Sequence, residues 1–366
     1  MIFPRDPFWC SWKSRVKTLN LGWQGCERPR PHVEVNRLRR TWPSAPPTSD
    51  HRYVLKLAAL TLAVFCCDHG RSADVNVDVV ELPSLRIEGR LAQAHTQGLE
   101  LVDGKYYVTA RRDDVAPKQA LLLRTGPTRT DWDVWDITPP RPACAEATLD
   151  HPGGMQSDGR RLWIPLAESK RNGRSLIRAF SLADLKAGSQ LKPVVEFPVN
   201  DHIGALAVSI ERGELFGANW DTEKVYVWDL KGNQRRILSG DELKARALGV
   251  VTGIEARTGV AVQDWKIVGD RLFASGLFRP PETATASAAS RLSWFERFLE
   301  RDFRRWTVTL PRQDGTELAN EAMAVSKGFV YFLPEDLGTS NRLFRVSLDE
   351  LTKHGAPDNS QSLRAR

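Results

Sequence analysis

The chain has 366 residues, of which 41% are hydrophobic and 27% charged, a composition typical of a globular protein with an ordinary core. Its formal charge of +7 comes from residues 1–73, which hold 12 Lys and Arg against 5 Asp and Glu; the remaining residues balance at 40 against 40. The charge therefore gives no support to a nucleic-acid-binding surface, and we expect no nucleic-acid partner.

The first 73 residues have the composition of a leader. Residues 1–53 are rich in Pro, Arg and Trp without a sustained period, which indicates a dispensable extension or an over-extended reading frame. Residues 54–73 combine the apolar run VLKLAALTLAVFCC with basic flanks and a small-residue site, the layout of a signal peptide. We therefore expect an exported protein, periplasmic or extracellular; a lipid anchor on Cys66 or Cys67 and a buried core helix are the alternatives.

A unit of two short apolar strands around a Gly or Asp turn recurs five times at intervals of roughly 50 to 60 residues. The five units are Gly98–Arg111, Gly154–Ala167, Ala205–Trp220, Asp264–Gly276 and Ala322–Pro334. A third strand candidate follows each unit: ALLLRT, SLIRAFSL, KVYVWDL, RWTVTL and RLFRVSL. A fourth candidate follows in several units, as DVWDIT at Asp133–Thr138 and VVEFPV at Val194–Val199. Four short strands per repeat predict an all-β fold, a β-propeller of about five blades. Six blades, with an irregular one in 230–262, and a β-sandwich are the alternatives.

The ring has a predicted closure. The last unit lacks a fourth strand, whereas VDVVELP at Val77–Pro83 has no partner before the first unit. Placing that N-terminal strand in the final blade would remove the exposed edges, so we expect the propeller to span 74–355 and 356–366 to be a disordered tail. Cys144 is the one cysteine after residue 73, so no intrachain disulfide is expected there.

Two segments interrupt the strand pattern. Asp241–Leu248 resembles a short helix. Residues 281–305 are predicted to form a helical insert, in which an Ala-, Ser- and Thr-rich linker leads into RLSWFERFLERDFRR, with an apolar stripe and an Arg-rich face. Such a helix would pack as a lid on its own domain. Membrane contact is expected only if the 291–304 helix lies at an interface.

Three histidines precede the first strands of consecutive units, in AHTQG (His95), DHPGG (His151) and DHIGA (His202). Innermost strands surround a propeller's axis, so the three side chains are expected to meet at one central pocket. Three imidazoles could hold one divalent metal ion, with oxygen ligands nearby from Gln263, Asp264, Asn320 or Glu321. The alternatives are blade junctions fixed by hydrogen bonds and metal-free contact with a ligand.

The predicted ligand-binding set comprises His95, Gln97, His151, Gln156, His202 and Asn320. Asp264 and Glu321 are the catalytic candidates, and together with Glu100 they suggest an acid pair for glycoside hydrolysis. Tryptophans 163, 220, 228 and 265 would either stack on a sugar or fill the core between blades. No G-x-S-x-G, P-loop, H-E-x-x-H or dinucleotide motif occurs.

Three functions follow from these patterns. The first is a secreted propeller that binds a small-molecule or glycan ligand in its central pocket. The second is a metal-dependent hydrolase or lyase that uses the axial histidines, with Glu321 or Asp264 as the base. The third is a protein-interaction scaffold that uses the rim or the 291–304 helix. The sequence leaves open whether the protein is an enzyme, which cofactor it has, and its oligomeric state.

The strings DHPGGMQSDGRRLWIPLAES, NDHIGALA and ELFGANW resemble an uncharacterised family of exported bacterial proteins, a domain of unknown function predicted to be a propeller. The resemblance covers most of 78–352 and is strongest at 149–230. It implies the fold and export, without any activity. A fainter likeness to gluconolactonase-type propellers would imply a calcium ion held by Glu, Asn and Asp. This chain departs from that pattern because it has histidines at the predicted axis.

Overall fold

The computed structural model describes residues 75–140, 148–220, 222–246, 261–278 and 289–357. The chain divides into two units, Met1–Cys66 and Cys67–Arg366, and the described residues all lie in the second. The predicted extension at 1–53, the signal peptide at 54–73 and most of the C-terminal tail lie outside the described residues. Within the described ranges, no helix is long and apolar enough to cross a membrane.

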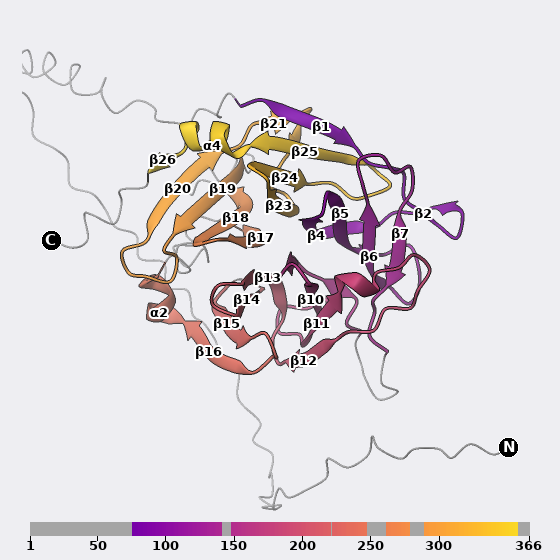
Figure 1. Cartoon of the computed structure of the whole chain (residues 1–366), viewed down its shortest axis with the longest axis horizontal. Helices are drawn as coiled ribbons and strands as arrows, with labels where there is room; N and C mark the ends of the chain where they lie inside the picture. Colours follow the sequence, from indigo (N-terminus) through magenta and orange to yellow (C-terminus); the bar gives the residue numbers. More distant parts are fainter. Residues whose placement is uncertain (1–74, 141–147, 221, 247–260, 279–288, 358–366) are drawn as a thin grey trace, which may run out of the picture. The chain divides into compact units, whose positions relative to one another are not determined.

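Five antiparallel sheets surround a common centre in Figure 1, which confirms the predicted all-β propeller and its five blades. The innermost strands are β4 (His95–Val102), β8 (His151–Pro152) with β9 (Gln156–Ser157), β13 (Ile203–Ser209), β17 (Ala261–Val268) and β23 (Ala322–Ser326). The second strands are β5 (Lys105–Arg112), β10 (Arg161–Ala167), β14 (Glu214–Asn219), β18 (Arg271–Phe278) and β24 (Phe329–Leu333). The third strands are β6 (Gln119–Thr125), β11 (Ser175–Ser181), β15 (Lys224–Asp229), β19 (Ala289–Glu296) and β25 (Arg342–Ser347). The fourth strands are β7 (Asp133–Asp136), β12 (Val195–Val199), β16 (Gln234–Ser239), β20 (Arg304–Thr309) and, from the other end of the chain, β1 (Val77–Glu81).

Strand β1 closes the ring as predicted. It pairs antiparallel with β25, in register from Val77 opposite Val346 to Glu81 opposite Arg342. The last blade therefore combines one strand from the N-terminal end of the ring with three from the C-terminal end. This exchange leaves the last blade with four strands and joins the two ends of the ring through backbone hydrogen bonds.

The prediction of a helical insert at 281–305 is wrong for residues 289–305, the part of this range that the structure describes. Ala289–Glu296 forms β19, the third strand of the fourth blade, and RWTVTL belongs to the fourth strand, β20, rather than the third. Leu292 and Trp294 are buried in alternation along β19, as a strand requires. The helix-like spacing arose because Phe298 and Leu299, in the turn after β19, pack into the adjacent core.

Short elements follow or connect the strands of the blades. Two two-stranded ribbons occur, β2 (Arg86–Ile87) with β3 (Arg90–Leu91) and β21 (Arg312–Gln313) with β22 (Thr316–Glu317). Helix α2 (Gly240–Lys244) confirms part of the short helix expected at Asp241–Leu248. Helix α4 (Leu348–His354) leads into β26 (Ala356–Pro357), which pairs with β20, so these two residues are not part of a disordered tail.

Five apolar clusters hold the ring together, one between each pair of neighbouring blades. Trp163 and Trp228 belong to the cluster between the second and third blades, and Trp265 belongs to the cluster between the third and fourth. All three indoles are fully or almost fully buried, and burying such a side chain contributes roughly 1.5–3 kcal/mol. These three tryptophans therefore fill the core between blades, which was one of the two interpretations of the sequence, rather than stack on a sugar.

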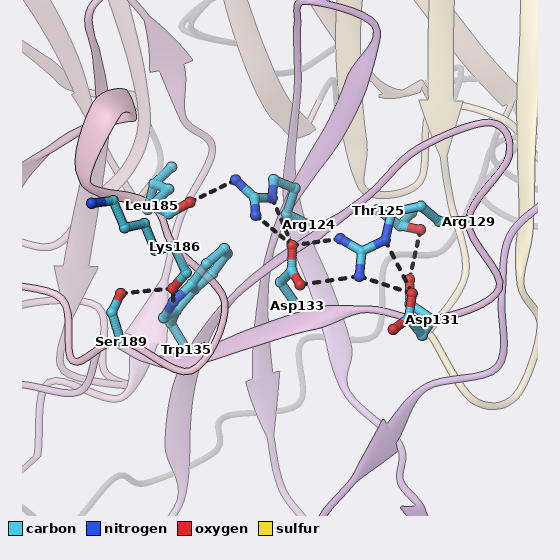
Figure 2. A network of polar contacts seen from close by, with 9 residues as sticks. All are labelled: Arg124, Thr125, Arg129, Asp131, Asp133, Trp135, Leu185, Lys186 and Ser189. Atoms are coloured by element: carbon cyan, nitrogen blue, oxygen red, sulfur yellow. Dashed lines mark hydrogen bonds and ion pairs between the residues drawn. The ribbon is translucent and has the colours of Figure 1, made fainter.

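A charged network also joins the first two blades at their outer part (Figure 2). Asp133 on β7 accepts hydrogen bonds from Arg124 Nε at 2.8 Å and from Arg129 Nη2 at 3.0 Å. Arg124 Nη1 reaches the carbonyl of Leu185 in the second blade, at 2.8 Å. Burial opposes ionisation of Asp133, but the hydrogen bonds from Arg129 and Arg124 outweigh it and hold its pKa below the usual value.

Replacing Asp133 with asparagine is expected to lower the free energy of unfolding by about 2–4 kcal/mol, because Arg124 loses its buried counter-ion. Asp131→Asn is the matched control: its side chain is 71% exposed and bonds to the same Arg129, so the expected change is below about 1 kcal/mol. Urea unfolding followed by tryptophan fluorescence measures both. Equal effects of the two substitutions would contradict the role of Asp133.

Candidate functional site at one end of the propeller axis

The three predicted histidines lie at the same end of the propeller axis, at or next to the starts of innermost strands. His95 begins β4, His151 begins β8, and His202 immediately precedes β13. The rings of His151 and His202 are 5.4 Å apart between centroids. Second strands end on the same side, because each runs antiparallel to its innermost strand. We call this end of the axis the axial mouth.

His151 is held as a neutral ring by Arg111, at the end of β5. Arg111 Nη1 lies 2.6 Å from His151 Nδ1. A guanidinium can only donate, so Nδ1 accepts and the ring proton is on Nε2. Burial, followed by the positive charge of Arg111, lowers the pKa of His151 to about 3. At neutral pH, His151 therefore carries an Nε2–H donor whose orientation Arg111 fixes.

His202 supports an exposed indole. Its side chain is buried, with 2% of the residue exposed, and its Nδ1 donates to the carbonyl of Glu168 at 2.8 Å. Burial lowers its pKa. Its ring contacts Trp220 edge-on at 4.5 Å between centroids, and Trp220 also lies 6.4 Å from His151. Because Trp220 is 46% exposed, the indole rather than His202 is the accessible surface.

The fifth blade brings two carboxyl groups to the axial mouth. Asp336 Oδ1 lies 2.7 Å from His95 Nδ1, and these side chains are 45% and 31% exposed. Glu321 immediately precedes β23, and burial, with the negative charge of Asp336, raises its pKa to about 8. Asn320 Nδ2 donates to the carbonyl of Pro334 at 3.2 Å and lies 3.4 Å from Glu321 Oε1.

A β-bulge at matching positions shapes three of the innermost strands near the axial mouth. Strands β4, β13 and β17 each shift by one residue in register against the second strand of their blade. The shifts occur at Gln97, Gly204 and Gln263. All three residues are half-buried. A bulge redirects the side chain of the extra residue, and Glu321 holds the same position in the fifth repeat. Gln97 and Glu321, both predicted from the sequence, thus share one level of the axis.

Gln156 and Asp264, also predicted as site residues, lie instead in a buried network inside the ring. Asp264 Oδ1 lies 2.6 Å from Lys266 Nζ, and Asp264 Oδ2 accepts from the backbone N–H of Met323 in the fifth blade. Gln156 Oε1 accepts from the backbone N–H groups of Val208 and Ile267, in the third and fourth blades.

Glu100 completes this network, since its Oε2 accepts from the N–H of Ser157 in the second blade. We call Glu100, Gln156, Asp264 and Lys266 the axial plug. All four are buried, and their hydrogen bonds cross-link the innermost strands of the five blades. The structure therefore places Gln156 and Asp264 among blade-joining contacts rather than at the axial mouth.

The predicted divalent-metal site has no support in this geometry. Among the residues that the structure describes, no three or more His, Cys, Asp or Glu are arranged to hold a metal ion. The Nδ1 atoms of His95, His151 and His202 bond instead to a carboxylate, a guanidinium and a backbone carbonyl.

Sequence reasoning missed Arg111 and Asp336, the partners that fix His151 and His95. Arg111 is near the end of a second strand, and Asp336 follows one by three residues. The signal was available in the repeat itself: innermost strands begin where second strands end, so polar residues at the end of each two-strand unit meet the histidines.

Residues 136–336 match the family model described as Family of unknown function (DUF6454). The chain belongs to this family. The matched region contains His151, His202, Glu321 and Asp336, whereas His95 lies before it. The predicted resemblance to a family of unknown function is thereby confirmed. No curated protein matches the chain.

Solved structures similar to this chain include distant propellers. The α-L-arabinofuranosidase Arb93A from Fusarium graminearum, in complex with an iminosugar inhibitor, is 9% identical, covering 77% of this chain and all of that one, with a TM-score of 0.43. The WD40 domain of Toxoplasma gondii coronin is 13% identical, with 72% of each chain covered and a TM-score of 0.34. The β-propeller domain of the Trilobed protease from Pyrococcus furiosus is 9% identical, covering 66% of this chain and 78% of that one, with a TM-score of 0.32.

Proposed function

We propose that the protein binds a small carbohydrate at the axial mouth. One observation carries the proposal: the half-exposed indole of Trp220 lies beside His151, which offers a neutral Nε2–H donor. A sugar ring has apolar C–H faces that pack on aromatic rings and hydroxyl groups that need oriented hydrogen-bond partners. The half-buried Gln97 and Asn320 add amide groups that both donate and accept.

The charge of the axial mouth favours an uncharged ligand. Arg111 is held by Asp113 through two hydrogen bonds, at 2.8 and 2.9 Å, so its charge is already compensated. The neighbouring His151 is neutral, and Asp336 is paired with His95. An anionic ligand would have to displace one of these pairs, whereas hydroxyl groups can bond to the remaining donors and acceptors. The predicted export of the chain fits a carbohydrate met outside the cytoplasm.

Binding of neutral monosaccharides and disaccharides to the full-length chain, measured by calorimetry, tests the proposal. Trp220→Ala is expected to weaken the affinity for the sugar that binds at least tenfold, because the stacking face is removed. Ile210→Ala is the matched control: Ile210 is 64% exposed but follows the far end of β13, so its loss should leave the affinity unchanged. Binding of none of the sugars, or equal affinities of the parent and Trp220→Ala, would refute the proposal.

A further inference from the structure

Glu321 and Asp336 lie at the same end of one hairpin. Glu321 immediately precedes β23, and Asp336 lies three residues beyond β24, the antiparallel partner of β23. The two strands pair from Ala322 opposite Leu333 onward, so the residues that flank this first pair leave the sheet together. A backbone bridge between Ala94 and Leu337 then holds the segment of Asp336 against the start of β4.

The two carboxyl groups have opposite surroundings. Asp336 is nearly half exposed, and its Oδ1 lies 2.7 Å from His95 Nδ1. Glu321 is in a desolvated position beside the negative charge of Asp336, and both effects favour its protonated form. Two neighbouring carboxyl groups, one desolvated and one open to water, are placed to divide the roles of acid and base.

We propose that the axial mouth hydrolyses a glycosidic bond, with Glu321 as the general acid and Asp336 as the general base. This inference rests on the proposed carbohydrate binding, and adds a reaction to it. A protonated and an ionised carboxyl group on either side of a sugar are the groups that this reaction requires. Trp220 and His151 would hold the sugar ring beside them.

The reaction balances without another reactant. The bond between the anomeric carbon and the glycosidic oxygen breaks, and the leaving oxygen takes the proton from Glu321. A water oxygen forms the new bond to the anomeric carbon, and the water's proton goes to Asp336. One water is consumed, and two hydroxyl-bearing products leave. Asp336 then returns its proton to Glu321 through solvent, which restores the starting state.

His95 and Asn320 are positioning residues in this scheme. His95 bonds one oxygen of Asp336, Oδ1, which limits the rotation of that carboxyl group and leaves its other oxygen as the base. Asn320 is anchored on the carbonyl of Pro334 and lies within 3.4 Å of Glu321 Oε1, which limits the rotation of that carboxyl group. His95, at the start of β4, and Asn320, just before β23, are thus both tied to the segment after β24, which fixes the acid and the base relative to each other.

Aryl glycosides of common pentoses and hexoses test the assignment. Phenyl glycosides need a proton on their departing oxygen, whereas 2,4-dinitrophenyl glycosides have a leaving group stable without one. Glu321→Gln is expected to lower kcat/KM for phenyl glycosides by about 10²–10⁴-fold and for dinitrophenyl glycosides by less than about tenfold. Asp336→Asn should lower both by about 10²–10⁴-fold, because water needs the base in either case.

Glu196→Gln is the control, since Glu196 lies on the outer strand β12 with its side chain 42% exposed. Calorimetric sugar binding and thermal unfolding of Glu321→Gln show whether the variant is folded. Sugar binding without hydrolysis of any glycoside by the parent would overturn the inference and leave the proposed binding intact. Absence of both sugar binding and hydrolysis in the parent would refute the proposed carbohydrate binding, and with it the reaction that depends on it. Equal losses on phenyl and dinitrophenyl glycosides in a folded Glu321→Gln would overturn its role as the acid.

Discussion

Lys266→Met is expected to lower the free energy of unfolding by about 3–5 kcal/mol, because it leaves a fully buried carboxyl group without its counter-ion. Lys266 is 1% exposed, and its Nζ lies 2.6 Å from Asp264 Oδ1 and 3.1 Å from the carbonyl of Trp265. Methionine has a similar length, so the change removes the charge and the donors while it largely preserves the packing. Denaturant unfolding measures the loss.

The carboxylate of Asp264 explains why this loss should be large. Asp264 is fully buried, and it crosses the axis so closely that a Cβ on Gly154 would meet its Oδ1 at 2.5 Å. Two backbone N–H groups, of Trp265 and Met323, also bond to it. Without Lys266, these two hydrogen bonds are too few to stabilise a carboxylate in a low-dielectric interior. The carboxyl group of Asp264 must then bind a proton.

Two controls separate this effect from a general cost of removing a lysine. Lys224→Met changes a half-exposed lysine 3.6 Å from Asp201, so the expected loss is below about 1 kcal/mol. The double variant Asp264→Asn with Lys266→Met removes both charges, and should recover at least half of the stability that the single variant loses. A single variant within 1 kcal/mol of the parent would show that the ion pair contributes little to the closed ring.

The blades and their closure could be predicted because both leave a local pattern in the sequence. Each two-strand unit consists of two short apolar runs around a turn with Gly or Asp, and Val77–Glu81 reads as a strand with no neighbour to pair with. The fourth blade was misread at β19 because Phe295, Phe298 and Leu299 repeat at helical spacing. Phe298 and Leu299 follow the strand and pack from a turn, where Arg297 has a positive φ of 53° that breaks the regular backbone.

The candidate site was predictable in its location but not in its chemistry. Repeat alignment placed His95, His151 and His202 at one end of the axis, and they lie there. Their hydrogen-bond partners come from other strands, and spacing alone does not reveal that Arg111 or Asp336 occupies an imidazole nitrogen. Three histidines that bind one metal ion and three histidines that each bond to a different partner therefore have the same sequence signature.

The axial plug was hidden from the sequence for a related reason. Glu100 and Gln156 stand at equivalent places in successive repeats, and Lys266 holds the same place in the fourth. Each of these polar residues directly follows a buried apolar residue, and a polar side chain in that place fits a ligand pocket as well as a buried network. Only the closeness of the blades at the axis decides between them: a Cβ on Gly98, in the first blade, would lie 2.9 Å from the carbonyl oxygen of Gly153, in the second.

Glu100 should make the stability of the protein depend on pH. Burial raises its pKa from 4.5 to about 7, although the positive charge of Lys266 opposes this shift. Between pH 4.5 and 7, the folded chain keeps a proton that the unfolded chain has released. The contribution of Glu100 to the free energy of unfolding is therefore complete below pH 4.5. It falls as the pH rises toward 7, by up to about 1.4 kcal/mol per pH unit.

Glu100→Gln isolates this contribution, because an amide of the same shape cannot ionise. His151, His202 and Glu321 titrate in both proteins, so the difference between parent and variant retains the contribution of Glu100 and of its electrostatic coupling to Asp264. The free energy of unfolding of the parent minus that of Glu100→Gln is expected to fall by about 2–4 kcal/mol between pH 4.5 and pH 7.5. A difference for Glu100→Gln that stays constant or rises with pH would mean that Glu100 is ionised in the folded ring, with Lys266 compensating its charge.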